Sequence, residues 1–467
     1  MALNEDPQIG GRIKRLRRQQ GLSQAQLADA MGISGSYLNL LEHNRRRITV
    51  PLLFKLAGYF GVEPGELADS DETQLTGDLM EAFGDEMFAE SDLTNQDIRD
   101  LASAHPNAAR AVLRLFDRYQ SLHRAGGNGN SAPSTPGYHA ATEAISDFLQ
   151  ENANHFPALE AAAERVREDI DHSGDSFEAG LRAYLFNVFG LDWRLAALPA
   201  GMARRLEGRV LAVSETLPGE SATFMVAHQL ALLAAEREIE AIIVASTLPE
   251  GDAPGLARNV LAAYFAAALI MPYEAFLKAC RDTRYDIERL ERRFRTSFEQ
   301  VCHRMTTLQR PGASGIPLHL VRTDIAGNIS KRFSLSGIHI PRHSGACPRW
   351  NVYSAFLHPE QVNIQISQMP EGQKFFCIAK SITKGGHRHN APKRYFSIGL
   401  GCAIAYAPQM IYSDGIDLAN PAQTVPIGVG CRICPRLDCG QRAHPPADYR
   451  FELSQDERPE TLYGRIG

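Results

Sequence analysis

Cysteine is missing from the first half of this 467-residue sequence. All eight cysteines lie from Cys280 to Cys439, and the last three are only a few residues apart. Disulfide frameworks belong mainly to small secreted domains rather than to long chains of this kind. The distribution therefore argues against a disulfide-rich protein, and metal binding is the better interpretation of a tight cysteine cluster.

Long hydrophobic runs are missing as well. The longest uncharged apolar stretch runs from Asn259 to Tyr273, and it is shorter than the ~20 residues that a membrane-spanning helix needs. Residues 1–11 contain Glu5 and Asp6 but no apolar segment, which argues against a secretory signal. We expect a cytoplasmic protein with no membrane partner.

Charge is unevenly distributed, although the formal net charge is only -5. Residues 1–60 carry nine basic against four acidic side chains, which gives this segment a net charge of +5, whereas residues 61–120 are rich in Asp and Glu. A small basic module is typical of a protein with a polyanionic partner. The acidic segment masks this module in the total charge.

The length predicts about three domains of ~100 to 200 residues each, and 44% of the residues are hydrophobic. Residues 124–137 are rich in Gly, Asn, Ser and Pro, a composition that predicts a flexible linker. We expect a multidomain, mainly α protein with an all-α helix-turn-helix head, an α-rich middle and an α+β C-terminal domain. The expected boundaries are residues 1–70 for the head, 71–123 for an acidic helical connector, 124–137 for the linker, 138–310 for the middle and 311–467 for the C-terminal domain.

Two short helices joined by a tight turn are predicted in the head. Ser23 and Gln26 form the pattern of a capping box, which starts a helix that ends near Met31. Gly32 then turns the chain. The second helix starts after Ser34, and its apolar residues lie three apart at Leu38 and Leu41, so that they face inward.

Three consecutive arginines follow the second helix, and a helix with a basic flank is what a reader of the DNA major groove needs. The segment GLSQAQLADAMGISGSYLNLLEHNRR resembles the phage-repressor-like (XRE) helix-turn-helix family over about residues 8–68. The resemblance implies that residues 33–43 contain the recognition helix. The candidate DNA contacts are Gln24, Ser34, Ser36, Tyr37, Asn39, Arg45, Arg46 and Arg47.

The middle contains an incomplete protease motif, AHQLALL, on an apparently helical segment. A zinc protease needs His-Glu-x-x-His, but only His228 matches, because Gln229 cannot act as a base and Leu232 cannot bind zinc. The surroundings resemble the metallopeptidase-like domain of several bacterial regulators, which implies a scaffold that has lost catalysis. A plain buried helix with one hydrogen-bonded His is the alternative, and both predict no peptidase activity.

Near the C-terminus, the sequence GVGCRICPRLDCGQRAHPP places Cys431, Cys434 and Cys439 as Cys-x-x-Cys-x-x-x-x-Cys. This spacing lets the thiolates turn toward one metal centre. Three arginines in the same segment are expected to favour the thiolate forms: Arg432, Arg436 and Arg442.

The metal is expected to be a four-iron, four-sulfur cluster, with zinc as the alternative. Zinc normally fills four positions and no second Cys-x-x-Cys lies nearby, whereas such a cluster can take its fourth ligand from elsewhere. Cys347 is favoured as that ligand because it also lies in a Gly and Pro loop. The alternatives are Cys377, Cys402 and His444.

Together these features cover nearly the whole chain. The head, the peptidase-like middle and the tail motifs SKRFS, GACPRWNVYSAF and VGCRICPRLDCGQRAHP resemble the short-chain fatty acyl transcriptional regulators, bacterial regulators of acetate and propionate metabolism. The resemblance implies a sensor for a short acyl-CoA and, in some members, an iron-sulfur cluster on the three-Cys loop.

A CoA site needs cations for its phosphates and an apolar slot for the acyl chain. One short stretch supplies the candidate cations Lys331, Arg332, Arg342, His343 and Arg349. The segment from Lys384 to Asn390, KGGHRHN, is a competing phosphate cradle.

The leading hypothesis is a ligand-responsive transcription factor that is not an enzyme and binds a double-stranded DNA operator as a homodimer or higher oligomer. One alternative is a metal- or redox-dependent enzyme with a DNA-binding head, either peptidase-like or acyl-CoA-handling. Another is a redox sensor in which the cluster alone is the input. No Gly-x-Ser-x-Gly or Walker-type motif appears in the sequence to support other familiar enzymes.

Overall fold

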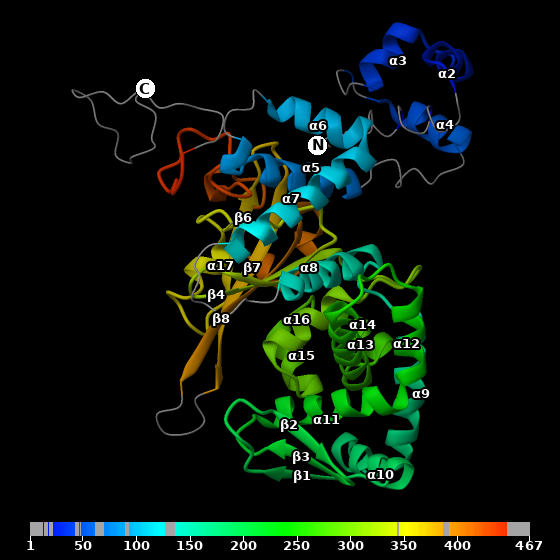
Figure 1. Cartoon of the computed structure of the whole chain (residues 1–467), viewed down its shortest axis with the longest axis vertical. Helices are drawn as coiled ribbons and strands as arrows, with labels where there is room; N and C mark the ends of the chain where they lie inside the picture. Colours follow the sequence, from blue (N-terminus) through cyan, green and yellow to red (C-terminus); the bar gives the residue numbers. More distant parts are fainter. Residues whose placement is uncertain are drawn as a thin grey trace, which may run out of the picture.

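The computed structural model describes residues 13, 17, 22–42, 46, 48–60, 70–88, 93–126, 136–342, 345–385 and 392–445. The head lies at one end of the molecule and the helical middle at the other, with the C-terminal sheet between them (Figure 1). A group of connector helices lies between the head and the sheet. The predicted fold class, mainly α with an α+β C-terminal region, is confirmed.

The head contains the two expected helices and a third one. The Ser23 and Gln26 capping box is present, and Gly32 ends the first helix in the left-handed conformation, with φ 68°. Leu38 and Leu41 are buried in the core of the head, as their spacing predicts. The helices are α2 (Gln24–Met31), α3 (Gly35–Glu42) and α4 (Val50–Phe60).

The connector folds into helices that share a small core around Leu79, Ile98 and Ala109. Its last helix extends to Gly126, and the next helix starts at Pro136, so the predicted linker lies partly outside the described residues. The connector elements are α5 (Ser70–Phe83), η2 (Glu86–Phe88), α6 (Asn95–Ala104) and α7 (Pro106–Gly126).

The middle is helical as expected, but it also contains a small sheet that its sequence does not predict. Its strands lie in the order β1-β3-β2, with β1 parallel and β2 antiparallel to β3. The elements are α8 (Pro136–Glu151), α9 (Pro157–His172), α10 (Phe177–Phe189), β1 (Asp192–Ala196), β2 (Arg204–Glu207), β3 (Val210–Ser214), α11 (Gly219–Ala234), α12 (Glu236–Ala245), α13 (Asp252–Ile270), α14 (Tyr273–Asp282), α15 (Ile287–Phe294) and α16 (Phe298–Thr306).

Helix α13 is the one helix of the described residues that is long and apolar enough to cross a membrane by length and composition. Its most apolar window is 61% buried inside the protein, and its side chains form part of the largest core. The burial is that of the central helix of a folded domain.

The C-terminal region contains a six-stranded sheet in the order β5-β4-β8-β7-β6-β9. All neighbouring strands are antiparallel except β6 and β9. The β7–β8 hairpin extends beyond the sheet alongside the middle (Figure 1), and its strands are longer than the short strands expected. The elements are β4 (Leu318–Asp324), β5 (Ile329–Ser334), α17 (Asn351–Ser354), β6 (Asn363–Gln368), β7 (Lys374–Gly385), β8 (Lys393–Ala403), η3 (Ile404–Gln409), η4 (Ile411–Ser413), η5 (Pro421–Gln423) and β9 (Thr424–Pro426).

The two faces of this sheet belong to different cores. One face contributes Leu320, Ile378 and Ile398 to the core of the middle, so the middle and C-terminal regions share one continuous core. The opposite face contributes Val321 and Cys377 to a second core under α17 and the segment that carries Cys347. Alternate residues of each strand therefore pack into different cores.

Candidate functional site

Helix α3 is held in place by a buried ion pair at its C-terminal end. The guanidinium of Arg17 donates to the carboxylate of Glu42 at 2.6 and 3.0 Å, and also to the carbonyl of Leu22 at 2.9 Å. The side-chain amide of Gln24 donates to Glu42 at 3.0 Å. Gln24 starts α2 as predicted, but its amide is directed to α3, so its described role is to fix that helix.

The predicted DNA contacts of α3 lie on its outer side. Ser34 caps the helix by accepting a bond from the backbone N–H of Tyr37 at 3.1 Å, and Ser36 and Asn39 are exposed. Arg46 is exposed, with its guanidinium carbon 6.0 Å from the ring centroid of Tyr37. Arg45 and Arg47 lie outside the described residues.

An arginine side chain contacts the residues of the incomplete protease motif. Arg204 of β2 donates to the side-chain oxygen of Gln229 and lies 3.0 Å from Nδ1 of His228. Burial and the charge of Arg204 lower the pKa of His228 to about 4. A guanidinium therefore lies where a zinc protease would need its metal, which opposes metal-dependent catalysis here.

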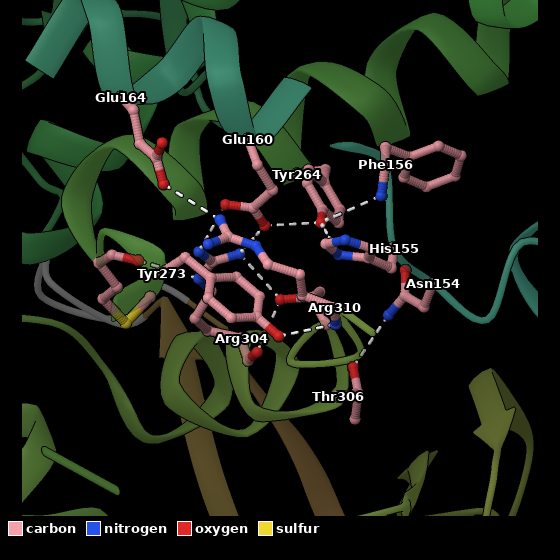
Figure 2. Close-up of polar contacts among 12 residues, drawn as sticks. Asn154, His155, Phe156, Glu160, Glu164, Tyr264, Tyr273, Arg304, Thr306 and Arg310 are labelled. Atoms are coloured by element: carbon pink, nitrogen blue, oxygen red, sulfur yellow. Dashed lines mark hydrogen bonds and ion pairs between the residues drawn. The ribbon is translucent and has the colours of Figure 1, made fainter. Parts of the chain in front are cut away.

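A buried ion pair joins helices of the middle (Figure 2). Arg304 of α16 donates to both carboxylate oxygens of Glu160 of α9, at 2.6 and 2.9 Å, and to the carbonyl of Met271 at 2.9 Å. The hydroxyl of Tyr264 of α13 donates to Glu160 at 2.7 Å. Burial alone would raise the pKa of Glu160, but Arg304, together with the hydroxyl of Tyr264 and with His155, lowers it below its usual value.

The network continues to the start of the C-terminal region. Arg310 lies over the ring of Tyr273, with its guanidinium carbon 4.1 Å from the centroid, and pairs with Glu164 and Glu274 at 3.2 and 2.6 Å. The backbone N–H of Arg310 donates to the hydroxyl of Tyr273 at 2.7 Å. These contacts fix the position at which the chain leaves the middle (Figure 2).

Residues of both predicted phosphate cradles meet at a single carboxylate. Glu299 of α16 is buried and pairs with Arg322 at 2.8 Å, with Lys331 at 3.8 Å and with Lys384. Burial would raise the pKa of Glu299, but His303 and the surrounding cations hold it far below its usual value. Lys331 and Lys384 are half-exposed, so this cation cluster faces solvent at its edge.

The other predicted CoA cations lie elsewhere. Adjacent residues of a strand point to opposite faces, so Arg332 lies away from Lys331 and pairs with Glu143 of α8. Arg342 pairs with Asp147 of α8 at 2.7 Å. His343 lies outside the described residues, and Arg349 is half-buried beside Cys347. The structure therefore does not gather the five predicted cations into one site.

Helix α5 of the connector is docked on the C-terminal region by charge. Asp78 pairs with Arg342 at 2.9 Å, and the backbone N–H of Arg342 donates to Glu81 at 2.7 Å. Gly77 lies so close to His339 that a Cβ at this position would collide with the ring. His339 itself is buried, with Nδ1 3.9 Å from Asp78.

The end of α5 also touches the Cys loop, which we define as residues 427–443. A Cβ on Gly84 would lie 2.7 Å from Cγ2 of Ile433. Ile433 stands between Cys431 and Cys434. The element that follows the head is therefore in direct contact with the Cys-x-x-Cys segment.

Cys347 and the three cysteines of the Cys loop influence one another. Burial raises the pKa of Cys347, and the charges of Cys431 and Cys434 raise it further. Cys439 acts in the same way on Cys434. Among the described residues, however, no three His, Cys, Asp or Glu side chains are gathered as a single metal ion requires.

Backbone N–H groups surround three of these thiols. The N–H groups of Arg349 and Gly428 lower the pKa of Cys347, the N–H of Arg436 does so for Cys434, and the N–H of Ala443 donates to Sγ of Cys431 at 3.4 Å. Hydrogen bonds of this kind stabilise thiolates and tune iron-sulfur centres. The donor set and its surroundings therefore fit a cluster held by four thiolates.

The arginines favour the thiolate form as predicted, but they do not determine the pKa of Cys434. Arg436 and Arg442 do act to lower the pKa of Cys434, but its burial outweighs them and the pKa is raised. Arg442 instead holds the loop together, because it donates to the carbonyls of Cys431 and Cys434 at 2.6 and 2.7 Å.

The alternative fourth ligands have other neighbours. The thiol of Cys377 lies 3.6 Å from Nε2 of His319, and that of Cys402 lies 3.8 Å from the sulfur of Met410. Burial raises the pKa of both. His444 is exposed.

Three known protein families match segments of this chain, from the head to the C-terminal region. Residues 307–463 match the C-terminal domain of short-chain fatty acyl coenzyme A regulators, residues 190–306 match the IrrE N-terminal-like domain, and residues 13–67 match a helix-turn-helix model. The propionyl-CoA carboxylase regulator of Cereibacter sphaeroides is 36% identical over 455 residues, which is 96% of each chain. The chain belongs to the short-chain fatty acyl coenzyme A regulator family.

A curated sequence and a solved structure from Mycobacterium tuberculosis support this membership. The HTH-type transcriptional regulator PrpR is 37% identical over 459 residues, covering 96% of this chain and 93% of the relative. A solved structure of a transcriptional regulator is 38% identical, has a TM-score of 0.66, and covers 70% of this chain and 99% of its own. The relatives of this regulator are transcription factors, which agrees with the arginine at the protease motif.

The regulator also contains functional candidates that sequence reasoning missed. Arg204 follows a loop and carries no motif, and Glu299 looks like any acid on an amphipathic helix. Gly84 and Asp78 lie in a segment noted only for its acidity. Their partners are distant in the chain: Glu81 and Arg342, for example, lie 261 positions apart. No local pattern could therefore have revealed them.

We expect substitutions in the regulator's head to separate sequence reading from general DNA affinity. Replacing Ser36 and Asn39 with Ala should lower the discrimination between operator and random DNA, by about 1–3 kcal/mol for each base that is no longer read. Arg46→Ala should weaken binding to both DNAs and reduce the salt slope by about 1, because it removes a phosphate contact. Fluorescence anisotropy over a range of salt concentrations measures both, and operator binding that survives deletion of residues 1–70 would contradict the assignment.

Proposed function

We propose that this protein is a transcriptional regulator whose head binds operator DNA and whose C-terminal region senses a short-chain acyl-CoA. The family membership and the helix-turn-helix support regulation of short-chain acyl-CoA metabolism through DNA. The observation that carries the sensing proposal is the direct contact of α5 with the Cys loop and with Arg342. Because α5 follows the head, a change in the C-terminal region has a physical route to the DNA-binding helices.

The description of the family and the name of one relative support this choice of ligand class. The C-terminal match is to regulators of short-chain fatty acyl coenzyme A, and one relative is named for propionyl-CoA carboxylase. CoA carries phosphates that need cations. The cation cluster of Arg322, Lys331 and Lys384 is the better candidate for them, because its three cations share one carboxylate, Glu299, and the two lysines are half-exposed. Arg332 and Arg342 instead pair with acids of α5 and α8.

We further propose that Cys347, Cys431, Cys434 and Cys439 hold a four-iron, four-sulfur cluster. The thiols affect one another's charge but do not meet around one ion. A four-iron cluster can take three ligands from one loop and the fourth from elsewhere, which suits the Cys loop and Cys347, whereas a closed zinc site would favour a second Cys-x-x-Cys. When bound, the cluster would supply redox sensitivity and hold the Cys loop to the Cys347 segment.

Cys434→Ser should abolish the brown colour and broad visible absorption of anaerobically purified protein, since one of four ligands is removed. Cys377→Ser is the matched control, because that thiol is buried in the sheet with its sulfur 3.6 Å from Nε2 of His319. Iron and sulfide analysis beside the absorption spectrum measures the outcome. Colourless wild-type protein with one zinc per chain would overturn the iron assignment.

The DNA-binding form is proposed to be a homodimer. A single recognition helix such as α3 reads only a few base pairs, and two-fold pairing places a second one about one helical turn away on the duplex. The operator is then expected to be a palindrome with half-sites at that spacing.

Sequencing the DNA fragments bound in cells tests the regulatory assignment. We expect enrichment of palindromic sites beside genes of short-chain acyl-CoA metabolism. If the bound fragments have no common sequence, and if deletion of residues 1–70 does not change which fragments are bound, the regulatory role is rejected. The alternative of a redox sensor is tested by adding acyl-CoA to protein of constant iron content and measuring the operator affinity. A redox sensor with the cluster as its only input would show no change.

A further inference from the structure

Four exposed arginines lie on and just after α15, a short helix of the middle. Residues three and four apart on a helix are neighbours, so the three arginines of the helix share one side, while Ile287 and Leu290 are buried on the other. The fourth arginine follows the helix directly. We define these four residues as the arginine face: Arg289, Arg292, Arg293 and Arg295.

The arginine face has no acidic partners among the described residues. The ion pairs of this region use other cations, since Glu288 of α15 pairs with Lys380 at 3.7 Å and Asp282 of α14 pairs with Lys278 at 2.7 Å. Arg293 has an aromatic contact instead, with its guanidinium carbon 5.8 Å from the ring centroid of Phe294. The charges of the face are therefore available to a partner.

Helix stability does not account for the positions of these arginines. Cations are favourable in the last turn of a helix, where Arg292 and Arg293 lie. Arg289 lies in the first turn, where the helix dipole opposes a cation, and it is four residues before Arg293, a spacing at which like charges repel. Arg295 ends the helix in the left-handed conformation, with φ 51°, which favours Gly or Asn. A role in binding explains these choices better.

The arginine face is an exception on an acidic body. The net charge of the chain is -5 and includes +5 from residues 1–60, so residues 61–467 carry a net charge of -10. Four cations without acids on such a body attract a polyanion. Duplex DNA carries one negative charge per ~1.7 Å of its axis, and arginines neutralise its phosphates. Because the chain has a helix-turn-helix head and belongs to a family of transcriptional regulators, DNA is the polyanion that it meets.

We propose that the arginine face is a second contact with the DNA backbone, outside the helix-turn-helix head. It binds phosphates and not bases, so it adds affinity without sequence preference. The head lies at one end of the molecule and α15 lies within the middle (Figure 1), so the contact takes a stretch of duplex other than the half-site. The inference goes beyond the proposed function but rests on DNA binding by the head.

Arg292→Gln combined with Arg293→Gln tests the arginine face in the full-length protein. Both side chains are exposed and Gln is a good helix former, so the fold should be retained. Affinity is measured over a range of salt concentrations on two duplexes. One ends at the operator, and the other has flanks longer than the ~150 bp persistence length of DNA, so that it can bend back.

The two duplexes should respond differently to this double substitution. On the long duplex, the slope of log affinity against log salt should become less steep by about 2, because each phosphate contact contributes about 0.9. On the short duplex, the variant should bind as the wild type does. Replacing Arg292 and Arg293 with Lys keeps both cations and should retain the wild-type slope on the long duplex.

Arg165→Gln combined with Arg258→Gln is the matched control. It removes the same charge from two arginines of the middle that already pair with acids, Glu238 and Glu240. If the double Gln variant of the arginine face changes the slope on the long duplex no more than this control does, the face does not contact DNA and the inference is wrong.

Two further outcomes are distinguishable. If the double Gln variant of the arginine face binds the long duplex as the wild type does but sediments as a smaller oligomer, the face contacts a second copy of the chain, which also overturns the inference. Failure of the wild-type protein to bind the short duplex would contradict the proposed function of the head and not this inference, because the arginine face lies beyond the reach of that duplex.

Discussion

Glu160→Gln should lower the free energy of unfolding by about 3–5 kcal/mol, because it leaves the guanidinium of Arg304 buried without its counter-charge. Both side chains of this pair are almost fully buried, with exposures of 0% for Arg304 and 3% for Glu160. The substitution also weakens the bond from the hydroxyl of Tyr264. Urea unfolding followed by tryptophan fluorescence measures the decrease, since Trp193 belongs to the same core.

Glu274→Gln is the control for this prediction. Glu274 also pairs with an arginine, Arg310, but its side chain is 69% exposed. Exposed pairs contribute about 0–1 kcal/mol, so the unfolding midpoint should hardly move. Equal decreases for the two variants would show that the buried network of Figure 2 does not hold the middle together.

Gly84→Ala should disconnect ligand binding from DNA binding. The new methyl group would lie 2.7 Å from Cγ2 of Ile433, so α5 or the Cys loop must move away. We expect the operator affinity of this variant to change less than about twofold when propionyl-CoA is added, while its affinity for propionyl-CoA is retained. Operator-binding curves with and without the ligand measure the response.

Gly255→Ala is the matched control, because a Cβ at this position of α13 meets no atom within 4 Å. This variant should respond to propionyl-CoA as the wild type does. A full response in Gly84→Ala would mean that the contact between α5 and the Cys loop carries no signal. Asp78→Asn then tests the second contact of α5, its ion pair with Arg342.

The features that could be predicted from sequence are those encoded by neighbouring residues. The capping box at Ser23 and the turn at Gly32 fix α2 and its end locally, and the spacing of Leu38 and Leu41 determines which side of α3 is buried. The Cys loop is local in the same sense, because its three thiols lie within nine residues of sequence.

The features that could not be predicted depend on pairing across long distances. Strands β1 to β3 are only four or five residues long, so their alternation is too short to distinguish from the helical sequence around them. Arg332 and Arg342 looked like free cations because a sequence displays charges without their partners. Their partners Glu143 and Asp78 become neighbours only when α8 and α5 pack on the C-terminal region.

The central claim is that a short-chain acyl-CoA changes the affinity of this protein for its operator. Operator-binding curves of the wild-type protein, measured anaerobically with propionyl-CoA, with free CoA and without ligand, test it most directly. We predict that propionyl-CoA shifts the operator affinity by about 5- to 150-fold, the usual range of allosteric coupling, and that free CoA shifts it much less. Identical curves under all three conditions, from protein that binds propionyl-CoA, would contradict the claim.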